Sequence, residues 1–354
     1  MSRFVISARL RRPAAVASAV ASAVASASAV AVALLPASVA TAPAAGAAVH
    51  AAATARISPA FVLPGDRVYP EGIAADPRHG DLYAGSFQDG TVYRMHPGHR
   101  VAEVFLPAGA DGRNTANGLK VDGAGRLWVT SSASGVAVYD TRTRRLLARF
   151  DVPGPGTDAR FVNDLAITPD GTAYLTDSFR SVVYRVTSRD LARARAQGGR
   201  GALSVAFDLD DVLDPHKTGD FTLNGIVADP TGRFLLAADA HGGDLYRLDL
   251  ATGGNSRTVL HGADMLHADG LELQHGRLWT VHNVDNRIVR WRVAPDGRTA
   301  RREASLTDTS LQLPTTLARL RGTLYVVRSQ FDKGGPLGDG TPELPFTVAA
   351  VRGL

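Results

Sequence analysis

The sequence contains no cysteine among its 354 residues. This absence excludes disulfide cross-links, thiolate zinc sites, cysteine nucleophiles and lipid attachment through a cysteine side chain. Lysine is also rare: it occurs only at Lys120, Lys217 and Lys333, and arginine supplies almost all of the positive charge. With 45% hydrophobic and 21% charged residues, the composition excludes collagen and a wholly disordered chain. What is left is a globular protein long enough to bury a large core.

The positive charge is concentrated at the N-terminus. The formal net charge is +5, but residues 1–55 hold four arginines and no acidic residue. The rest of the chain therefore has 35 basic and 34 acidic residues. A body so close to neutral lacks the basic surface that nucleic acid or an anionic membrane would require, so we expect neither as a partner.

The first 40 residues have the layout of a secretory signal peptide. Residues 1–12 are basic, residues 13–35 are almost entirely Ala, Val, Ser and Leu, and small-residue triplets such as Ser38-Val39-Ala40 follow. The alternative is a membrane anchor, since the apolar run is long enough to span a bilayer. The weak hydrophobicity of Ala and Ser favours cleavage. We predict a signal peptide at 1–40, an Ala/Pro-rich linker at 41–57, and a secreted monomer that is not attached to the membrane after cleavage.

The rest of the chain repeats one pattern six times. Each copy begins with a polar lead residue, followed in most copies by glycine, an apolar strand, a turn and an aromatic-rich strand. The six lead residues are Glu71, Asn117, Asn163, Asn224, Asp269 and Thr315. They recur about every 46 residues, with one longer step of 61. A repeat of this length built from short strands is typical of one blade of a β-propeller.

We therefore predict an all-β fold, a six-bladed β-propeller of four-stranded antiparallel blades, over residues 58–354. The longer step indicates an insertion at 187–220, in which residues 188–193 have the pattern of a short capped helix. The segments 58–63 and 345–351 both read as strands. We expect them to share the last blade and close the ring.

The lead residues also suggest a site. The innermost strand of each blade starts beside the central axis, so the six polar side chains are expected to converge at one face. Two carboxylates and three carboxamides offer hard oxygen ligands that suit Ca²⁺ best, with Mg²⁺ or Mn²⁺ as alternatives. The other interpretation is that these side chains cap strand ends or line a water-filled channel.

Four of these positions resemble the metal-binding set of the regucalcin/gluconolactonase (senescence marker protein-like) propellers and, more distantly, that of diisopropyl fluorophosphatase. The matching segments are Pro70-Glu71-Gly72, Asn163-Asp164 after Phe161, Asn224-Gly225 and Asp269-Gly270. The resemblance implies one divalent metal held by Glu71, Asn163, Asn224 and Asp269, with Ca²⁺ as the first candidate and Mg²⁺, Mn²⁺ or Zn²⁺ as alternatives.

The resemblance further implies roles in catalysis and substrate binding. It makes Asp269 the catalytic general base as well as a ligand, and it places Asn163 beside the substrate. Arg160 matches a substrate-binding arginine of the family, although it lies three residues before Asn163 rather than two. Asn117 carries no ligand role from the family, but its place in the second blade would let it reach the substrate.

The loops after the second strand of each blade are expected at the same face. They carry Phe87, Phe179, His241, His282 and Phe331, which could form an apolar rim with two imidazoles. His282 could then transfer protons next to the substrate, and His267 could lie at the mouth. The alternative for each histidine is a structural hydrogen-bonding role.

Two functions from different classes remain. The first is a secreted metal-dependent hydrolase of small lactones or related esters, with phosphotriester hydrolysis at the same site as a variant of it. The second is a non-enzymatic propeller that binds a ligand or protein and keeps a structural calcium. The sequence has no nucleophile elbow, phosphate loop or H-E-x-x-H motif that would point elsewhere.

Overall fold

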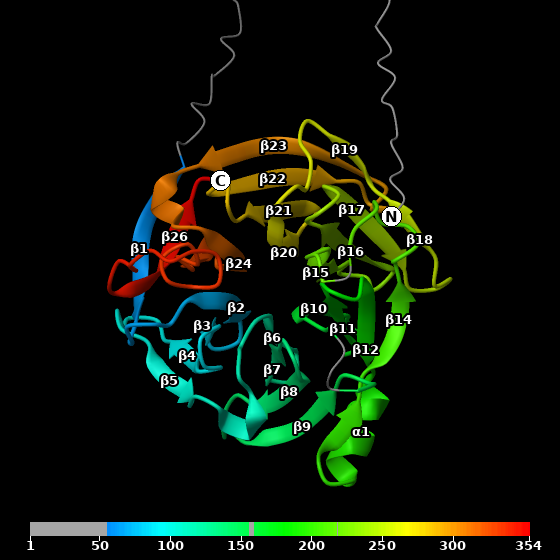
Figure 1. Ribbon diagram of the computed structural model, residues 1–354, viewed down its shortest axis with the longest axis horizontal. Coiled ribbons are helices and arrows are strands. Elements are labelled where there is room, and N and C mark those ends of the chain that lie inside the picture. Colours follow the sequence, from blue (N-terminus) through cyan, green and yellow to red (C-terminus); the bar gives the residue numbers. More distant parts are fainter. Residues whose placement is uncertain (1–54, 156–158, 218) are drawn as a thin grey trace, which may run out of the picture. The chain divides into compact units, whose positions relative to one another are not determined.

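Six β-sheets are arranged as a ring around a central axis (Figure 1). The computed structural model describes residues 55–354 except 156–158 and 218. The predicted signal peptide and nearly all of the predicted linker lie outside these residues. In the described part of the chain, no helix is long and apolar enough to cross a membrane. The predicted all-β, six-bladed propeller is confirmed.

The first three blades follow one another along the chain. The first contains β2 (Pro70–Asp76), β3 (Asp81–Ser86), β4 (Val92–Met95) and β5 (Glu103–Leu106), and the short 3₁₀ helix η1 (Ala110–Gly112) follows it. The second contains β6 (Leu119–Val121), β7 (Arg126–Ser131), β8 (Gly135–Asp140) and β9 (Leu146–Asp151). The third contains β10 (Val162–Ile167), β11 (Ala173–Asp177), β12 (Val182–Val186) and β14 (Ser204–Asp208).

The other three blades complete the ring. The fourth contains β15 (Leu223–Ala228), β16 (Phe234–Asp239), β17 (Asp244–Asp249) and β18 (Asn255–Arg257). The fifth contains β20 (Ala268–Gln274), β21 (Arg277–His282), β22 (Arg287–Val293) and β23 (Thr299–Thr307), followed by η2 (Thr309–Leu311). The sixth contains β24 (Pro314–Leu320), β25 (Thr323–Arg328), β26 (Phe346–Arg352) and β1 (Arg56–Leu63).

Two blades depart from the predicted four-stranded antiparallel form. The short strand β13 (Arg200–Ala202) pairs in parallel with β9 of the second blade, and β19 (Val259–His261) pairs in parallel with β23 of the fifth. Both are segments of connecting chain that run along the outer strand of a neighbouring blade. They cover an edge that would otherwise expose unpaired backbone groups.

Both ends of the propeller lie in the sixth blade, as predicted. β1 pairs antiparallel with β26, with Arg56 opposite Arg352 and Leu63 opposite Phe346. The strand order is β1-β26-β25-β24, so the C-terminal strand lies inside the sheet and the N-terminal strand forms its outer edge. The sheet begins at Arg56, two residues ahead of the predicted start.

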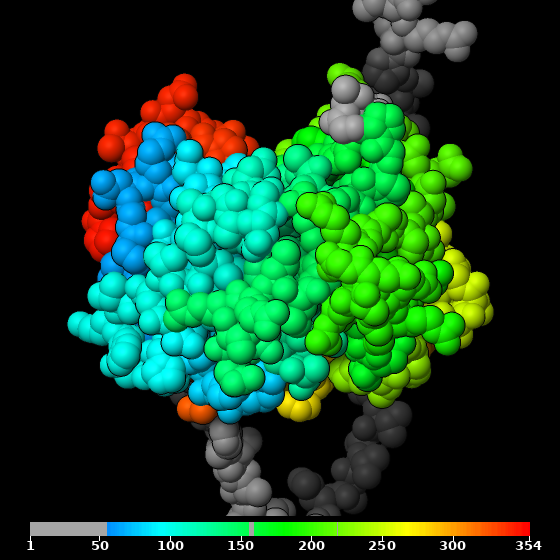
Figure 2. Space-filling model, turned by 90° about the horizontal axis from the view of Figure 1, so that it is seen from below, coloured from blue at the N-terminus to red at the C-terminus, as the bar shows by residue number. Residues whose placement is uncertain are grey.

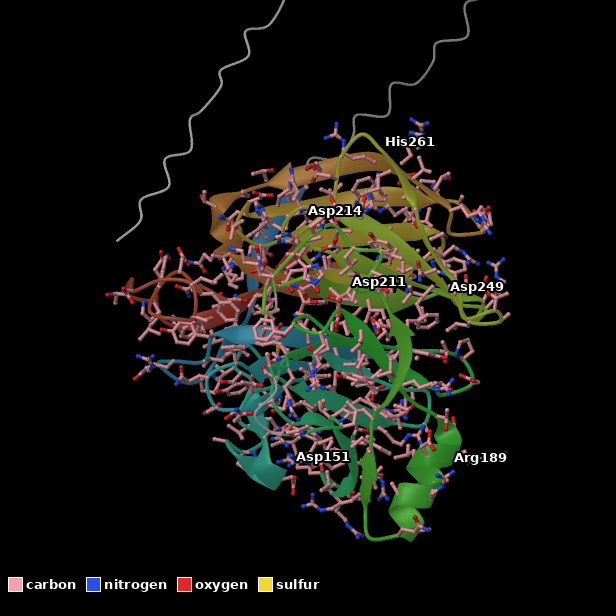
Figure 3. All side chains as sticks on the ribbon, turned by 45° about the vertical axis from the view of Figure 1, so that its right-hand side comes forward. Asp151, Arg189, Asp211, Asp214, Asp249 and His261 are labelled. Atoms are coloured by element: carbon pink, nitrogen blue, oxygen red, sulfur yellow. The ribbon has the colours of Figure 1, made fainter. Side chains whose placement is uncertain are left out.

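The predicted helix is also present. α1 (Ser188–Ala196) starts with a capping box, in which the Thr187 side chain accepts from the Asp190 backbone N–H and the Asp190 carboxylate accepts from the Thr187 N–H. Its two buried residues, Leu191 and Ala194, pack against the core between the second and third blades. The helix projects from the rim of the ring (Figure 1), and Arg189 on it lies far from the axis (Figure 3).

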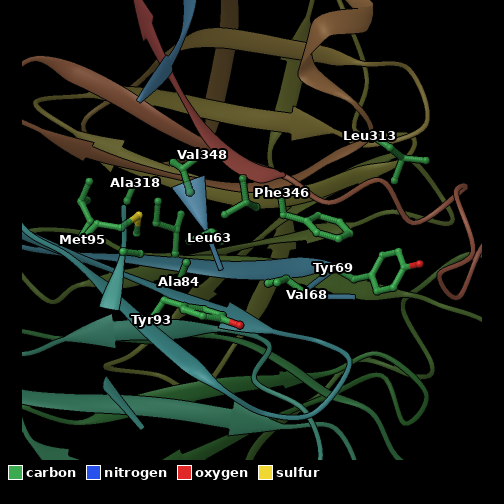
Figure 4. Packing of buried hydrophobic residues seen from close by; sticks show 14 of the residues in the cluster. Leu63, Val68, Tyr69, Ala84, Tyr93, Met95, Leu313, Ala318, Phe346 and Val348 are labelled. Carbon is green, nitrogen blue, oxygen red and sulfur yellow. The ribbon is translucent and has the colours of Figure 1, made fainter. Parts of the chain in front are cut away.

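The hydrophobic core is divided into six clusters, one between each pair of neighbouring blades. The cluster that joins the sixth blade to the first contains Leu63, Tyr69, Tyr93, Met95 and Phe346 (Figure 4). Aromatic residues of the repeated second strand fill other clusters; Tyr83, Trp128 and Trp279 are almost fully buried. Their predicted role in packing between blades is confirmed.

Candidate metal and active site

The inner strands carry the lead residues at an irregularity in strand pairing. In five of the six blades the register between the first and second strands shifts across the lead residue and its neighbour, for example between Val162 and Leu165 and between Ala268 and Leu271. Such bulges re-aim one side chain relative to the sheet. Here they turn the lead side chain from the sheet toward the axis.

The glycine after the lead residue is required by close packing rather than by backbone conformation. A Cβ atom on Gly72 would lie 1.7 Å from the Asn117 carbonyl oxygen, and one on Gly225 would lie 2.1 Å from the Asp269 carbonyl oxygen. Each glycine thus sits against the lead residue of the next blade. The inner strands β2, β6, β10, β15, β20 and β24 contact one another in a closed ring.

The third blade carries aspartate where its neighbours carry glycine. Asp164 is buried, and its carboxylate accepts hydrogen bonds from the backbone N–H of Leu165 at 2.8 Å and of Ile226, in the next blade, at 3.4 Å. It therefore links two inner strands through its side chain. It also adds a third carboxylate beside the two lead carboxylates.

Four side chains face one small hollow on the axis. A space of about 10 Å³, roughly what one water molecule requires, is bordered by Glu71, Asn163, Asp164 and Asp269. Asn224 joins this group through its side chain, because its Oδ1 accepts from Asn163 Nδ2 at 2.9 Å. The predicted convergence of Glu71, Asn163, Asn224 and Asp269 is therefore observed.

The carboxylates are electrostatically costly in this position. Burial raises the pKa of Glu71 well above its ordinary value, and the charges of Asp269 and Asp164 raise that pKa further. Burial also raises the pKa of Asp269 to about 8, although hydrogen bonds from Asn283 (Nδ2 to Oδ2, 3.0 Å) and Asn224 oppose the shift. A divalent cation between these side chains would offset the repulsion.

The donor set fits such a cation. Two carboxylates and two carboxamides are hard oxygen donors of the kind that Ca²⁺ prefers. The described residues contain no cluster of three or more His, Asp or Glu placed as metal ligands, so the carboxamides of Asn163 and Asn224 would have to complete the set.

Above the hollow the axis opens into a pocket of about 470 Å³. Its floor contains Glu71, Asn163, Asn224 and Asp269, so all four residues of the predicted metal set are accessible from it. The wall above them is formed by Phe87, Phe161, Phe221, Ala240, His241, Leu266, His267, Asn283, Val284, Phe331, Pro336 and Leu337, together with Asp220. Figure 2 shows the ring from the side, and its upper face is hollowed between the red C-terminal segment and the green segment.

Another hollow of about 500 Å³ lies away from the lead residues. It is lined by turn residues such as Asp122, Asp170 and Asp229, whose carboxylates bind backbone and side chains of their own turns. This second hollow therefore lacks uncommitted catalytic groups.

The structure corrects the predicted place of His282. Its side chain is completely buried in β21: Nδ1 lies 2.8 Å from the Leu266 carbonyl oxygen, and Nε2 lies 3.0 Å from Thr280 Oγ1. Burial lowers its pKa. His282 does not line the pocket, so the prediction that it contacts the substrate is wrong. Its ring instead makes hydrogen bonds inside the fifth blade.

Arg160 and Asn117 also lie outside the pocket wall. The Arg160 guanidinium donates to the Pro155 carbonyl oxygen, and Arg160 is not among the residues that line the pocket. Asn117 is fully buried and donates to Ser132 Oγ at 2.8 Å and to the Val162 carbonyl oxygen at 3.1 Å, while its Oδ1 has no partner among the described residues. The geometry therefore does not support direct contact with the substrate for Arg160 or for Asn117.

The rim contains residues that the sequence pattern did not single out. Phe87, His241, His267 and Phe331 line the pocket as expected, but so do Phe161, Phe221 and Asn283. Phe161 and Phe221 lie two and three residues before the lead residues Asn163 and Asn224. Their places just before inner strands were a signal for their position, because the chain immediately before an inner strand must cross the same face.

The fold and the axial site define a six-bladed propeller with an acidic, carboxamide-rich centre. Residues 69–327 match the SMP-30/gluconolactonase/LRE-like region, and the chain belongs to this family. None of the curated proteins compared with the chain matches it in sequence.

Solved structures with the same fold are distant in sequence. A gluconolactonase from Xanthomonas campestris is 17% identical with a TM-score of 0.56, over 85% of this chain and 90% of that one. The major Malassezia sympodialis allergen Mala s 1 is 15% identical with a TM-score of 0.57, over 80% and 93%. Virginiamycin B lyase from Staphylococcus aureus is 11% identical with a TM-score of 0.55, over 84% and 99%.

Proposed function

We propose that this protein is a gluconolactonase-like hydrolase of small lactones or related esters that depends on one divalent cation, with Ca²⁺ as the first candidate. The observation that carries the proposal is the shared floor of the pocket, where Glu71, Asn163, Asn224 and Asp269 meet. Membership of the family supports the reaction class.

The four floor residues would hold the cation. When bound, it would supply Lewis-acid polarisation of the ester carbonyl and a lower pKa for nearby water. Asp269 is the base: Asn283 holds its Oδ2 at 3.0 Å, which fixes the carboxylate beneath the pocket. Asn163 donates through Nδ2 to Asn224 Oδ1 at 2.9 Å and to Ser178 Oγ at 3.0 Å. Its Oδ1 is then the atom that would face the substrate.

The base role requires a positive charge nearby. With a pKa of about 8, Asp269 would be mostly protonated at neutral pH and unable to accept a proton. A cation among the ligands favours the ionised carboxylate. Metal dependence and the base role therefore stand or fall together.

The experiment is a panel of lactones, aryl esters and phosphotriesters, assayed with protein in excess calcium and with protein stripped by chelator. We expect hydrolysis of at least one lactone or ester, loss of that activity in chelator, and recovery on adding calcium. Equal rates in both states would contradict the metal mechanism. Calcium-stabilised folding without turnover of any substrate would instead favour the binding role with a structural calcium.

We also propose that the protein is exported as a monomer after cleavage of its leader, and that its partner is a small substrate. Residues 1–55 carry no acidic residue and have signal-peptide architecture. N-terminal sequencing of protein recovered from culture medium should find a start between residues 41 and 56. An intact Met1 or Ser2 terminus in that fraction would contradict cleavage.

A further inference from the structure

We infer that the substrate is a neutral lactone or ester with an aromatic or branched apolar substituent, rather than a polyhydroxylated sugar lactone or an anion. This inference rests on the proposed function, because it assigns the substrate of the same pocket. It follows from the distribution of apolar and charged side chains around the floor.

One side of the pocket is a continuous aromatic wall. Phe331 contacts Phe87, with ring centroids 5.2 Å apart, and Phe87 stacks on Phe161 at 6.3 Å. Phe161 lies 4.8 Å from Phe221 in an edge-to-face arrangement, and Phe179 supports both rings from outside the lining, at 5.4 and 4.8 Å. Rings from the first, third, fourth and sixth blades therefore form one apolar surface.

None of the described residues that line the pocket comes from the second blade. The contact between Phe87 and Phe161 joins the first blade to the third across the second. Asn117, the lead residue of the second blade, is fully buried. The Asn117 carboxamide is therefore not available to a substrate hydroxyl, whereas both phenyl rings line the pocket.

The wall is held in place by a buried carboxylate. Asp177, at the end of β11, accepts backbone hydrogen bonds from both Phe161 (2.9 Å) and Phe179 (3.1 Å) through the same Oδ1. Asp177 is completely buried. The loops that carry these rings are therefore fixed relative to β11, as a preorganised binding surface requires.

The mouth of the pocket exposes further apolar side chains. Phe221 is 48% exposed, Val284 49% and Leu337 54%, and Leu266 is exposed beside them. Large apolar side chains gathered at the entrance of a pocket with a polar floor indicate a ligand that covers them.

Charge complementarity excludes an anionic substrate. No arginine or lysine is among the described residues that line the pocket, and Asp220 places a carboxylate in its wall. A phosphate or carboxylate would therefore meet no paired cation in the wall. The other polar side chains of the wall, such as Asn283 and His267 of the fifth blade, are too few to satisfy a ring of hydroxyl groups that faces phenyl rings.

The test compares three δ-lactones whose leaving group is an alkoxide: δ-phenyl-δ-valerolactone, unsubstituted δ-valerolactone and glucono-1,5-lactone. We expect kcat/KM for the phenyl lactone to exceed that for δ-valerolactone by about tenfold or more, with the sugar lactone lowest. A kcat/KM for the sugar lactone equal to or above that for the phenyl lactone would overturn the inference while leaving the proposed hydrolase intact.

The variant Phe221→Ala tests the wall directly, because its side chain is half exposed and its removal should be tolerated by the fold. It should reduce kcat/KM for the phenyl lactone more than kcat/KM for δ-valerolactone, so that the preference for the phenyl lactone falls about tenfold. The matched control is Val205→Ala, a 52% exposed residue on β14 that is not in the pocket wall. An unchanged preference in Phe221→Ala would contradict the proposed wall.

A binding measurement separates this inference from the proposed function. If no lactone is hydrolysed, the hydrolase proposal fails, but calorimetry with the non-hydrolysable ether 2-phenyltetrahydropyran still tests the wall. Binding to the wild type and its loss in Phe221→Ala would support the apolar site. Absence of binding to the wild type, or equal binding to both proteins, would overturn it.

Discussion

At the scale of single residues, the centre of the ring brings together acidic side chains that repel one another. Glu71, Asp164 and Asp269 are all buried, and burial raises the pKa of each. The charge of Lys120 opposes this increase in the pKa of Asp164, but the Lys120 ammonium also lies 3.9 Å from the Glu272 carboxylate. The arrangement has a measurable consequence for stability.

Metal-free protein should lose stability as the pH rises from about 4 to 8. The pKa of Asp269 is about 8 in the folded protein, against 3.8 for an ordinary aspartate, so the folded state holds a proton that the unfolded state has released. This bound proton stabilises the folded state fully below about pH 4, and the stabilisation is lost as the pH rises through about 8. Tm measured in chelator should fall across this range, and saturating calcium should remove most of the fall.

The variant Asp269→Asn serves as the control for that titration. It cannot ionise, so its Tm in chelator should depend less on pH than that of the wild type. A wild-type Tm in chelator that rises steadily from pH 5 to pH 8 would show that these carboxylates are not held protonated by burial.

The sequence predicted the positions of the axial residues better than those of the rim residues. Glu71, Asn163, Asn224 and Asp269 could be found because the repeat fixes where each lead residue lies. His282 could not be placed, because a histidine that ends a strand reads the same whether it points into the pocket or into the core. The predicted role of Arg160 depended on its distance from Asn163 along the chain, which is three residues here rather than two.

At the scale of elements, the closed contact of the inner strands depends on glycine. Gly72 and Gly225 do not have positive φ angles, so their small size alone explains them. The pattern of lead residue and glycine was visible in the sequence, but the partner of each glycine is a carbonyl of the next blade. That contact emerges only when the blades are arranged in a ring.

The variant Gly225→Ala should lower stability by at least about 1–3 kcal/mol and weaken calcium binding, because its Cβ would displace the Asp269 backbone. Gly123→Ala is the matched control, since no atom lies within 4 Å of its added Cβ and its φ angle is not positive. Thermal melts in chelator and in calcium measure both effects. Equal melting of the two variants would contradict the close packing of inner strands.

The two additional parallel strands could not be predicted from the sequence. β13 and β19 have only three residues each and no alternation of apolar and polar positions that reveals a partner. They form because connecting chain passes beside an exposed strand edge. The first and second strands of the six blades, twelve in all, were predictable because their sequence pattern recurs in each blade.

At the scale of the whole molecule, the ring is closed by pairing between its two ends. β26 is hydrogen-bonded on both sides, to β25 and to β1. Deleting residues 345–354 would therefore remove a strand from within the last sheet and separate β1 from the rest of that sheet. We expect a strongly lowered Tm or aggregation.

A shorter deletion controls for the loss of chain length. Removing only residues 353–354 leaves β26 complete, because that strand ends at Arg352. Melting curves of the two truncated proteins should therefore differ widely. Wild-type melting after the longer deletion would contradict closure by this pairing.

The central claim is that the axial residues hold a divalent cation on which the chemistry depends. Calcium titration calorimetry of the wild type, Glu71→Gln, Asp269→Asn and Asn224→Ala, with lactone turnover at saturating calcium, tests it most directly. Each carboxylate variant keeps the side-chain size but removes one of two ligand charges, so its affinity should fall by orders of magnitude, and Asn224→Ala should lose less because water can replace a neutral oxygen. Asp269→Asn should remain inactive even when calcium is bound, whereas Asn224→Ala should partly recover. Wild-type calcium affinity in both Glu71→Gln and Asp269→Asn would contradict the account.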